Sequence, residues 1–410
     1  MKRILTVATL AALLLPCCQK TEIINPMDNY QGLMFTTEFG KLTKADPADA
    51  DGDGMANLQA QDFRIWAYAA HDFDNTPEDD TYQIYDDIHN IKVHDYLMTG
   101  STIGWKPEKQ YFWPGNGKSL CFFAVSDTTL FLGAEGSPAT TSHVNIKLEL
   151  EEGEDEETVK VPSLTVKDYV VDPNNPNNDL MVANFVKQHQ DQSEKKVNLK
   201  FNHTLSKVQF RFKTNQIAEG DEPINVFVQK LEVGQSSDEG VVTGGLKNKG
   251  KLEVTVKETT SGTETTAEVS TLNFGWTLGA DLAVFTDDYE DEPDDFPTVI
   301  DDVLVVDGDG TDKSAMKLTT TDEEFATWLV LPQDVKGKKV KITYLINGRQ
   351  FVNEFNLDAF TDSDNDANTC MWDVNQYIKY TINLSPNLIT FNANVTPWNP
   401  EDGNNVTHTN

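Results

Sequence analysis

The feature that most constrains this 410-residue chain is a two-residue alternation of apolar and polar side chains, repeated in short runs. Val197–Phe201, Val208–Phe212 and Ile378–Leu384 each place a polar residue at every second position. Successive side chains in a strand point to opposite sides, so such alternation indicates strands that bury one face. Almost no helical periodicity accompanies it. The sequence therefore predicts an all-β fold built from antiparallel sheets.

Turn residues separate these runs. Asn347-Gly348 lies between the alternating runs Val340–Tyr344 and Phe351–Phe355 and is a strong hairpin signal. Leu33–Phe39 is the first alternating run of the chain, and Ile389–Val395 is the last. Many short strands joined by turns favour β-sandwiches over a parallel sheet with crossover helices.

The N-terminus resembles an export signal. Lys2 and Arg3 precede the apolar stretch Ile4–Leu15, which is shorter than the roughly 20 residues needed to span a bilayer. Residues 1–17 are therefore predicted to be a signal peptide, followed by a lipidated Cys18. Cys17 is the other candidate, but Pro16 before it suits a signal peptidase poorly. An ordinary secretory signal that contains two cysteines is the alternative.

Composition narrows the range of partners. The net charge is −33, from 33 basic and 66 acidic residues, which argues against nucleic acid as a partner because phosphate contacts need clustered cations.

Ten polar residues, 187–196, mark the expected domain boundary. The prediction is an N-terminal domain at 18–190 and a C-terminal domain at 191–410.

Motifs for chemistry are few. The seven histidines show no zinc-protease spacing, and no serine-nucleophile turn occurs. With 66 acids, a pair of catalytic carboxylates would arise by chance, so we predict that the protein is not an enzyme and needs no cofactor.

Asp49, Asp51 and Asp53, followed by Gly54, resemble the opening of a calcium loop, but Ala60 stands where a bidentate Glu is expected. An acidic turn without calcium is the alternative.

Several ordered motifs resemble one family, the fimbrillin-type (type V) pilins of Gram-negative anaerobes. They are Trp105-x₇-Trp113-Pro114, Leu120–Val125, Asp179–Ala183, Val197-x-Leu-x-Phe201-x-His203-x-Leu-Ser-Lys-Val208, Leu329–Gln333, Trp372-x₂-Asn375-x-Tyr377-x₂-Tyr380-Thr-Ile-x-Leu384 and Ile389-x-Phe391-x₃-Val395-x₂-Trp398. Their order from about residue 30 to Trp398 carries the resemblance more than any one of them does. Alone, each aromatic is an ordinary core residue.

The resemblance implies two tandem transthyretin-like β-sandwich domains in a structural or adhesive subunit of a cell-surface fimbria. Such pilins reach the outer membrane as lipoproteins, and a trypsin-like protease then removes the lipidated segment with its first strand. Here that strand is Leu33–Phe39, and Lys44-Ala45 stands where such pilins often have Arg-Ala, with Lys41 nearby.

Loss of the first strand implies a vacancy that a neighbouring subunit fills by strand addition. Leu388–Val395 is the candidate donor, because Ile389, Phe391 and Val395 lie on one face of an alternating strand. An ordinary edge strand of its own domain is the alternative for this segment. For the whole protein, the alternative is a non-polymerising outer-membrane surface lipoprotein that binds glycan or host protein.

Overall fold

The protein is all-β in the part that the computed structural model describes. These residues are 32–38, 62–70, 83–97, 103–114, 119–126, 144–151, 159–171, 179–192, 196–215, 218–219, 222–235, 245–263, 265–279, 285–288, 315–357, 370–386 and 388–397. Within those ranges there is no α-helix, and hence no helix long and apolar enough to cross a membrane. The all-β prediction is confirmed.

The strands follow one another along the chain, and those that cover the alternating runs named above begin and end within two residues of them. They are β1 Met34–Glu38, β2 Phe63–Ala70, β3 Gln83–Leu97, β4 Ile103–Pro107, β5 Ser119–Ser126, β6 Val144–Glu151, β7 Val159–Val170, β8 Met181–Ala183, β9 Phe185–His189, β10 Lys196–His203, β11 Ser206–Lys213, β12 Ala218–Glu219, β13 Glu222–Pro223, β14 Val226–Gly234, β15 Lys249–Thr260, β16 Glu268–Leu278, β17 Phe285–Asp288, β18 Met316–Lys317, β19 Glu323–Val330, β20 Gln333–Asp334, β21 Lys339–Ile346, β22 Arg349–Asn356, β23 Met371–Trp372, β24 Gln376–Ser385 and β25 Leu388–Pro397.

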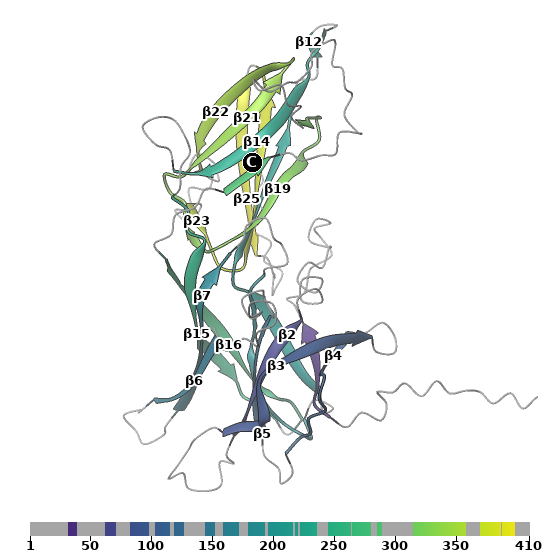
Figure 1. Ribbon diagram of the computed structural model, residues 1–410, viewed down its shortest axis with the longest axis vertical. Helices are drawn as coiled ribbons and strands as arrows, with labels where there is room; N and C mark the ends of the chain where they lie inside the picture. Colours follow the sequence, from purple (N-terminus) through teal and green to yellow (C-terminus); the bar gives the residue numbers. More distant parts are fainter. Residues whose placement is uncertain are drawn as a thin grey trace, which may run out of the picture.

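One large sheet builds the end of the molecule that holds β2 to β5 (Figure 1). Its strands run β2–β3–β4–β1–β10–β8–β5, and β5 pairs again with β2, so this part closes on itself. From β9 the same sheet continues through β16, β15 and β7 to β6. Strand β5 is consequently buried on both faces. One face lines the interior of the closed part, and the other packs against β7, β15 and β16.

The opposite end of the molecule is a sandwich of two sheets. The strand orders are β19–β11–β24–β25 and β17–β14–β21–β22, with β18 added to β14. The core between them includes Phe210, Trp328 and Tyr380, all at most 2% exposed. At the β21–β22 hairpin, Asn347 and Gly348 have φ of 45° and 79°, as a type I′ turn requires. The predicted hairpin is confirmed.

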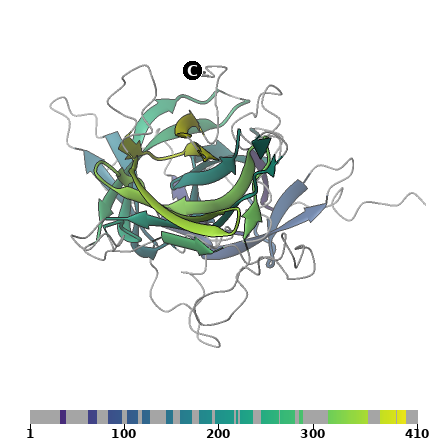
Figure 2. The ribbon, with the colours of Figure 1, turned by 90° about the horizontal axis from the view of Figure 1, so that it is seen from above.

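The two ends are interlocked along the chain. β10 belongs to the large sheet and β11 to the sandwich, and only Thr204 and Leu205 separate them. The chain then returns, because β15 and β16 leave the sandwich after β14 and join the large sheet. Figure 2, which looks down the long axis, shows the green and yellow strands of the sandwich lying over the rest. Hydrogen bonding therefore crosses the division predicted at residue 190, since β10, β15 and β16 pair with strands before it.

Candidate functional site

The first strand occupies a place between two strands that come much later in the chain. β1 pairs in parallel with β10, from Met34 opposite Lys196 to Glu38 opposite Lys200. On its other side it meets β4, where Phe35 lies opposite Trp105. The backbone N–H of Leu33 donates to the Tyr111 carbonyl at 2.6 Å. β1 is therefore the piece that closes the circuit of strands between β10 and β4.

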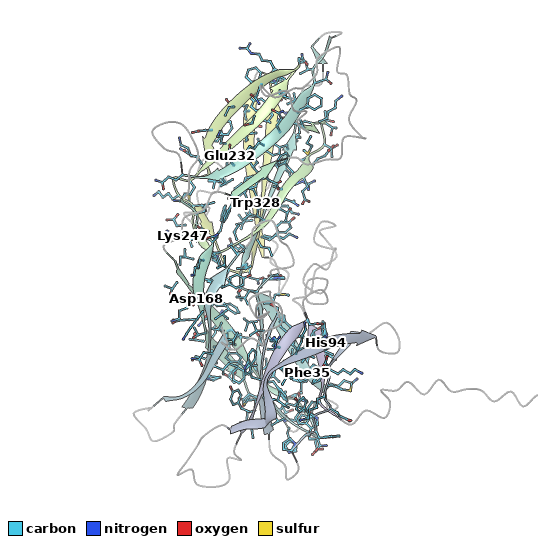
Figure 3. The ribbon with its side chains drawn as sticks, viewed as in Figure 1. Phe35, His94, Asp168, Glu232, Lys247 and Trp328 are labelled. Carbon is cyan, nitrogen blue, oxygen red and sulfur yellow. The ribbon has the colours of Figure 1, made fainter. Side chains whose placement is uncertain are left out.

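Two apolar side chains at the start of the first strand are completely buried. Leu33 and Phe35 are both 0% exposed, inside the same core as the strands around them. The Phe35 ring, labelled in Figure 3, packs edge-to-face with the rings of Phe63 and Phe122, whose centroids lie 6.3 and 5.6 Å from its own. We call the surroundings of β1 the cradle: the rings of Phe63, Phe122 and Trp105 and the facing edges of β4 and β10. Fully burying such side chains stabilises a fold by about 1.5–3 kcal/mol each.

Thr37 provides the polar contact of the cradle. Its hydroxyl accepts a hydrogen bond from Nε1 of Trp105 at 2.9 Å, and the Trp105 side chain is fully buried. The neighbouring Thr36 points the opposite way, where its hydroxyl donates to Oδ1 of Asn198 at 3.3 Å on the exposed side. Leu33, Phe35 and Thr37 therefore face the cradle, while Met34 and Thr36 alternate with them.

A buried pair of polar side chains, His203 and Asp179, holds the end of β10 beside the cradle. His203, the last residue of β10, places Nδ1 2.7 Å from Oδ2 of Asp179, and both side chains are 0% exposed. The Ser126 hydroxyl donates to the Asp179 carbonyl at 2.8 Å. Burial, with a smaller effect of the Asp179 charge, raises the pKa of Tyr169 well above its usual value. Breaking a buried pair by removing one partner destabilises strongly, so this pair ties β10 to the segment before β8.

The last strand lies at the edge of the sandwich. β25 pairs with β24 over ten opposed residues, from Ser385–Leu388 to Gln376–Pro397. Ile389, Ala393 and Val395 pack on the sandwich core but are only partly buried. Phe391 lies in the same strand, and its side chain is outside the described set. The structure thus gives β25 full backbone pairing along one side and incomplete burial of its apolar face.

Several predicted residues lie outside the described ranges. These are the signal segment 1–17 with Cys18, the processing candidates Lys44 and Ala45, and the calcium candidates Asp49, Asp51 and Asp53. Predictions for them stay predictions. In the ranges that are described, no group of three or more His, Cys, Asp or Glu side chains could hold a metal ion.

The chain matches a protein-family profile over most of its length. A profile described as fimbrillin-like covers residues 50–398. The chain belongs to the fimbrillin-like family. Fimbrillin-like proteins are fimbrial and adhesion proteins of the cell surface, so this protein is a structural or adhesion subunit and not an enzyme.

Solved structures resemble this fimbrillin-like chain at low identity. A fimbrial protein from Bacteroides vulgatus is 15% identical, with a TM-score of 0.46, covering 90% of this chain and 99% of that one. A candidate cell-adhesion protein from Bacteroides uniformis is 14% identical, with a TM-score of 0.41, covering 91% and 99%. A fimbrial assembly protein from Parabacteroides distasonis is 11% identical, with a TM-score of 0.33, covering 89% and 97%. No curated protein matches the sequence.

Sequence reasoning found both terminal strands of this fimbrillin-like protein but missed what surrounds the first one. The parallel pairing of β1 with β10 joins residues about 160 positions apart, and alternation carries no information about which strand pairs with which. Trp105 belongs to one of the family-like motifs, but nothing in that motif predicts its hydrogen bond to Thr37. A buried indole N–H usually has a partner, and that rule alone pointed to an acceptor nearby.

Proposed function

We propose that this protein is a subunit of a cell-surface fimbria, delivered to the outer membrane as a lipoprotein and assembled by β-strand exchange. The observation that carries the proposal is the position of β1. An N-terminal strand of five residues lies between β4 and β10, and Phe35 within it and Leu33 just before it are completely buried. A strand at one end of the chain is removable by a single cut on its C-terminal side.

The physical consequence of that cut supports the exchange. Without β1, the backbone groups of β10 that pair with Met34–Glu38 lose their partners, and the rings of Phe63 and Phe122 lose their contact with Phe35. Unpaired strand edges are templates for another strand, and an exposed apolar cradle adds a hydrophobic driving force. A strand from a second subunit restores both kinds of contact by strand addition.

The proposed donor is β25, with Ile389, Phe391 and Val395 on one face. It is an edge strand at the end of the described chain, and Ile389 and Val395 are only partly buried where they lie. Moving it out exposes less core than moving a central strand such as β11 or β24. If β25 instead stays in its own sheet as an ordinary edge strand, the cradle must take a strand from elsewhere.

The proposed order of events follows from the N-terminal segment. Cys18 carries the lipid, which holds the subunit in the outer membrane during export, since more than one acyl chain gives durable anchoring. A protease then cuts after Lys44, or after Lys41, and releases the lipid together with β1. A subunit that escapes the cut keeps its lipid and its filled cradle, so it acts as an anchor. Host or bacterial surface molecules are the proposed targets of adhesion.

The test is to change the processing residues and follow the protein on cells. Replacing Lys41 and Lys44 by Ala is expected to leave the full lipidated chain on the surface and to abolish the heat-labile ladders that polymers give on gels. Lys167→Ala, at an exposed position of β7, is the matched control and should process normally. Unchanged ladders and fibres in the double variant would overturn the processing step. Intact lipidated monomer from the wild-type chain would favour an anchor or a non-polymerising binding protein.

A further inference from the structure

We propose that two copies of this chain join edge to edge through β22, with the two strands antiparallel and Val352 of each copy at the two-fold axis. The contact is separate from strand exchange, because β22 and β25 belong to different sheets of the sandwich and β1 stays in place. It follows from the open edges of the sheets, the packing of β22 and the order of its side chains.

The open edges of the sheets differ in how well they are protected. In the described part, β6, β17, β19, β22 and β25 are the strands left with one neighbour at the ends of the large sheet and the sandwich. Natural proteins block such edges with charges, prolines and bulges. β6 carries Lys147, Glu149 and Glu151, β17 ends in two aspartates, and β19 begins with two glutamates beside a bulge. β25 is the proposed donor strand, which leaves β22.

β22 lies at the margin of the sandwich without that protection (Figure 1). It pairs with β21 at every position and has no bulge. It contains no proline, and no charged residue lies between Arg349 and Glu354. Val352, at its centre, is 51% exposed and is one of the few large apolar side chains that are exposed in the described part of the chain. A regular strand edge with an exposed apolar residue is a template for another strand.

Contacts on the core side hold β22 in position. The Phe351 ring stacks on Tyr344 with centroids 5.6 Å apart, and the Arg349 guanidinium lies over Phe351 at 5.4 Å from its centroid. Nδ2 of Asn353 donates to the Tyr344 hydroxyl at 2.9 Å. The edge is therefore ordered before any partner arrives, and binding to an ordered surface loses less conformational entropy.

The turn determines which backbone groups of β22 point to the open side. Ile346 and Arg349 flank the two-residue turn and form a hydrogen-bonded pair. Such pairs alternate with non-bonded pairs along an antiparallel ladder. Gln350, Val352 and Glu354 therefore direct their backbone N–H and C=O groups away from β21, toward the side where a second strand can bond to them.

The side chains of β22 complement themselves best in one antiparallel register. With Val352 on the two-fold axis, the valines of the two copies lie opposite each other and Gln350 lies opposite Glu354. The exposed valines then cover each other, and an amide donor faces a carboxylate. An axis at Asn353 would place Glu354 opposite Val352 and bring the two Glu354 carboxylates to diagonal positions, where they repel. An axis at Phe351 would place Val352 opposite Gln350, without an apolar partner.

A second copy is the partner that this register selects, because every residue of the contact is supplied by the same strand. One edge of eight residues is a small contact, so two single chains associate weakly. In a fimbria of the proposed kind the contact repeats along the fibre, and many weak contacts in parallel hold two fibres side by side.

Single cysteines along β22 test the pairing in the full, unprocessed chain. A residue on the two-fold axis meets its own copy with Cα atoms about 5.5 Å apart in a hydrogen-bonded pair, a distance that a disulfide spans. Val352→Cys, concentrated and mildly oxidised, is therefore expected to give a covalent dimer that reducing agent returns to monomer. Gln350→Cys is the matched control, because in this register its own copy lies roughly 14 Å away. The wild type shows what the native cysteines contribute.

Each outcome of the cysteine experiment decides the point. A dimer from Val352→Cys, with none from Gln350→Cys or the wild type, supports the proposal. A dimer from Gln350→Cys or Asn353→Cys in its place overturns the register, and no dimer from any of the three overturns the pairing. The chain is neither cut nor polymerised here, so the result does not depend on strand exchange. Failure of the wild type to form fimbriae would overturn the proposed function and leave this contact standing.

Lysine substitutions provide an independent measurement. Val352→Lys places a charge at the middle of the edge, which blocks pairing in natural sheets. Thr343→Lys is the matched control, since Thr343 lies opposite Val352 on the same face but in β21, away from the edge. Sedimentation of the otherwise unmodified chain should show the dimer dissociation constant raised at least about tenfold by Val352→Lys and less than about twofold by Thr343→Lys. Equal changes in the two variants would overturn the contact at β22.

Discussion

The two terminal strands of the described chain are held in opposite ways. β1 pairs with β10 over five residues and with β4 at a single position, yet Leu33 and Phe35 are completely buried. β25 pairs with β24 over ten residues, yet its described apolar side chains, Ile389, Ala393 and Val395, are only partly buried. β1 thus depends on side-chain packing, and β25 depends on backbone hydrogen bonds. Backbone hydrogen bonds form equally well with another strand, whereas side-chain packing is specific. The cradle therefore determines which strand fits it, and β25 is the strand that can change its partner.

The largest expected effect on stability comes from truncating one apolar side chain in β1 and one in β25. Phe35→Ala should lower the free energy of unfolding by about 3–5 kcal/mol, because it empties the space between Phe63 and Phe122. Ile389→Ala should cost less than half as much, since its side chain is partly exposed already. Urea unfolding of the unprocessed chain measures both. Equal losses would remove the distinction between the two strands.

A smaller effect concerns the polar contact of the cradle. Thr37→Val keeps the shape of the side chain and removes the acceptor of the Trp105 N–H, at an expected cost of about 1–3 kcal/mol. Thr36→Val is the matched control on the exposed side and should change stability by less than about 0.5 kcal/mol. The same unfolding measurement applies, with tryptophan fluorescence as the signal. A control as costly as the test variant would contradict the assigned orientation of β1.

The smallest effect lies in the sheet that carries β25. The hydrogen bond from Arg211 lowers the pKa of the Asp322 carboxyl, opposed by a smaller effect of burial. A lowered folded-state pKa contributes stability above the unfolded pKa, and this stability is lost as the pH falls through the folded value. Because Asp322 is 41% exposed, Asp322→Asn should cost only about 0.2–1 kcal/mol at pH 7.

The pH dependence of that variant is its check. The difference between Asp322→Asn and the wild type should vanish in acid, once the carboxyl is protonated in both the folded and the unfolded chain. Glu258→Gln, at an exposed position of β15, controls for the loss of one negative charge. A difference that persists in acid would assign the effect to packing and not to the ion pair.

Local pattern predicted the strands but not their partners. Val197–Phe201, Val208–Phe212 and Ile378–Leu384 alternate cleanly and form β10, β11 and β24. The turn chemistry of Asn347-Gly348 specified a hairpin because the partner strands are adjacent in sequence. Neither the parallel pairing of β1 with β10 nor the return of β15 and β16 to the large sheet has such a local signal. Those arrangements depend on which apolar faces fit together across the whole chain.

The same limit applies to the candidate site. The alternation of Leu33–Phe39 and Ile389–Val395 identified both terminal strands, since each is apolar on one face. His203 and Asp179 stand in two of the family-like motifs, but the motifs do not predict that they meet. His203 Nδ1 lies 2.7 Å from Asp179 Oδ2 because β10 pairs with β8. Whether such a hydrogen-bonded pair is buried is decided by the surroundings and not by the two residues.

The passage from β10 to β11 has a mechanical meaning. The two strands are consecutive stretches of one backbone, joined through Thr204 and Leu205, and they reach from the cradle to the sheet that holds β24 and β25. Tension applied to a strand seated in the cradle therefore has a direct covalent path from β10 to the far sheet. Because β1 runs parallel to β10, a pull on its N-terminal end strains their hydrogen bonds together and not one after another. This geometry resists a pull along the strands more than one across them.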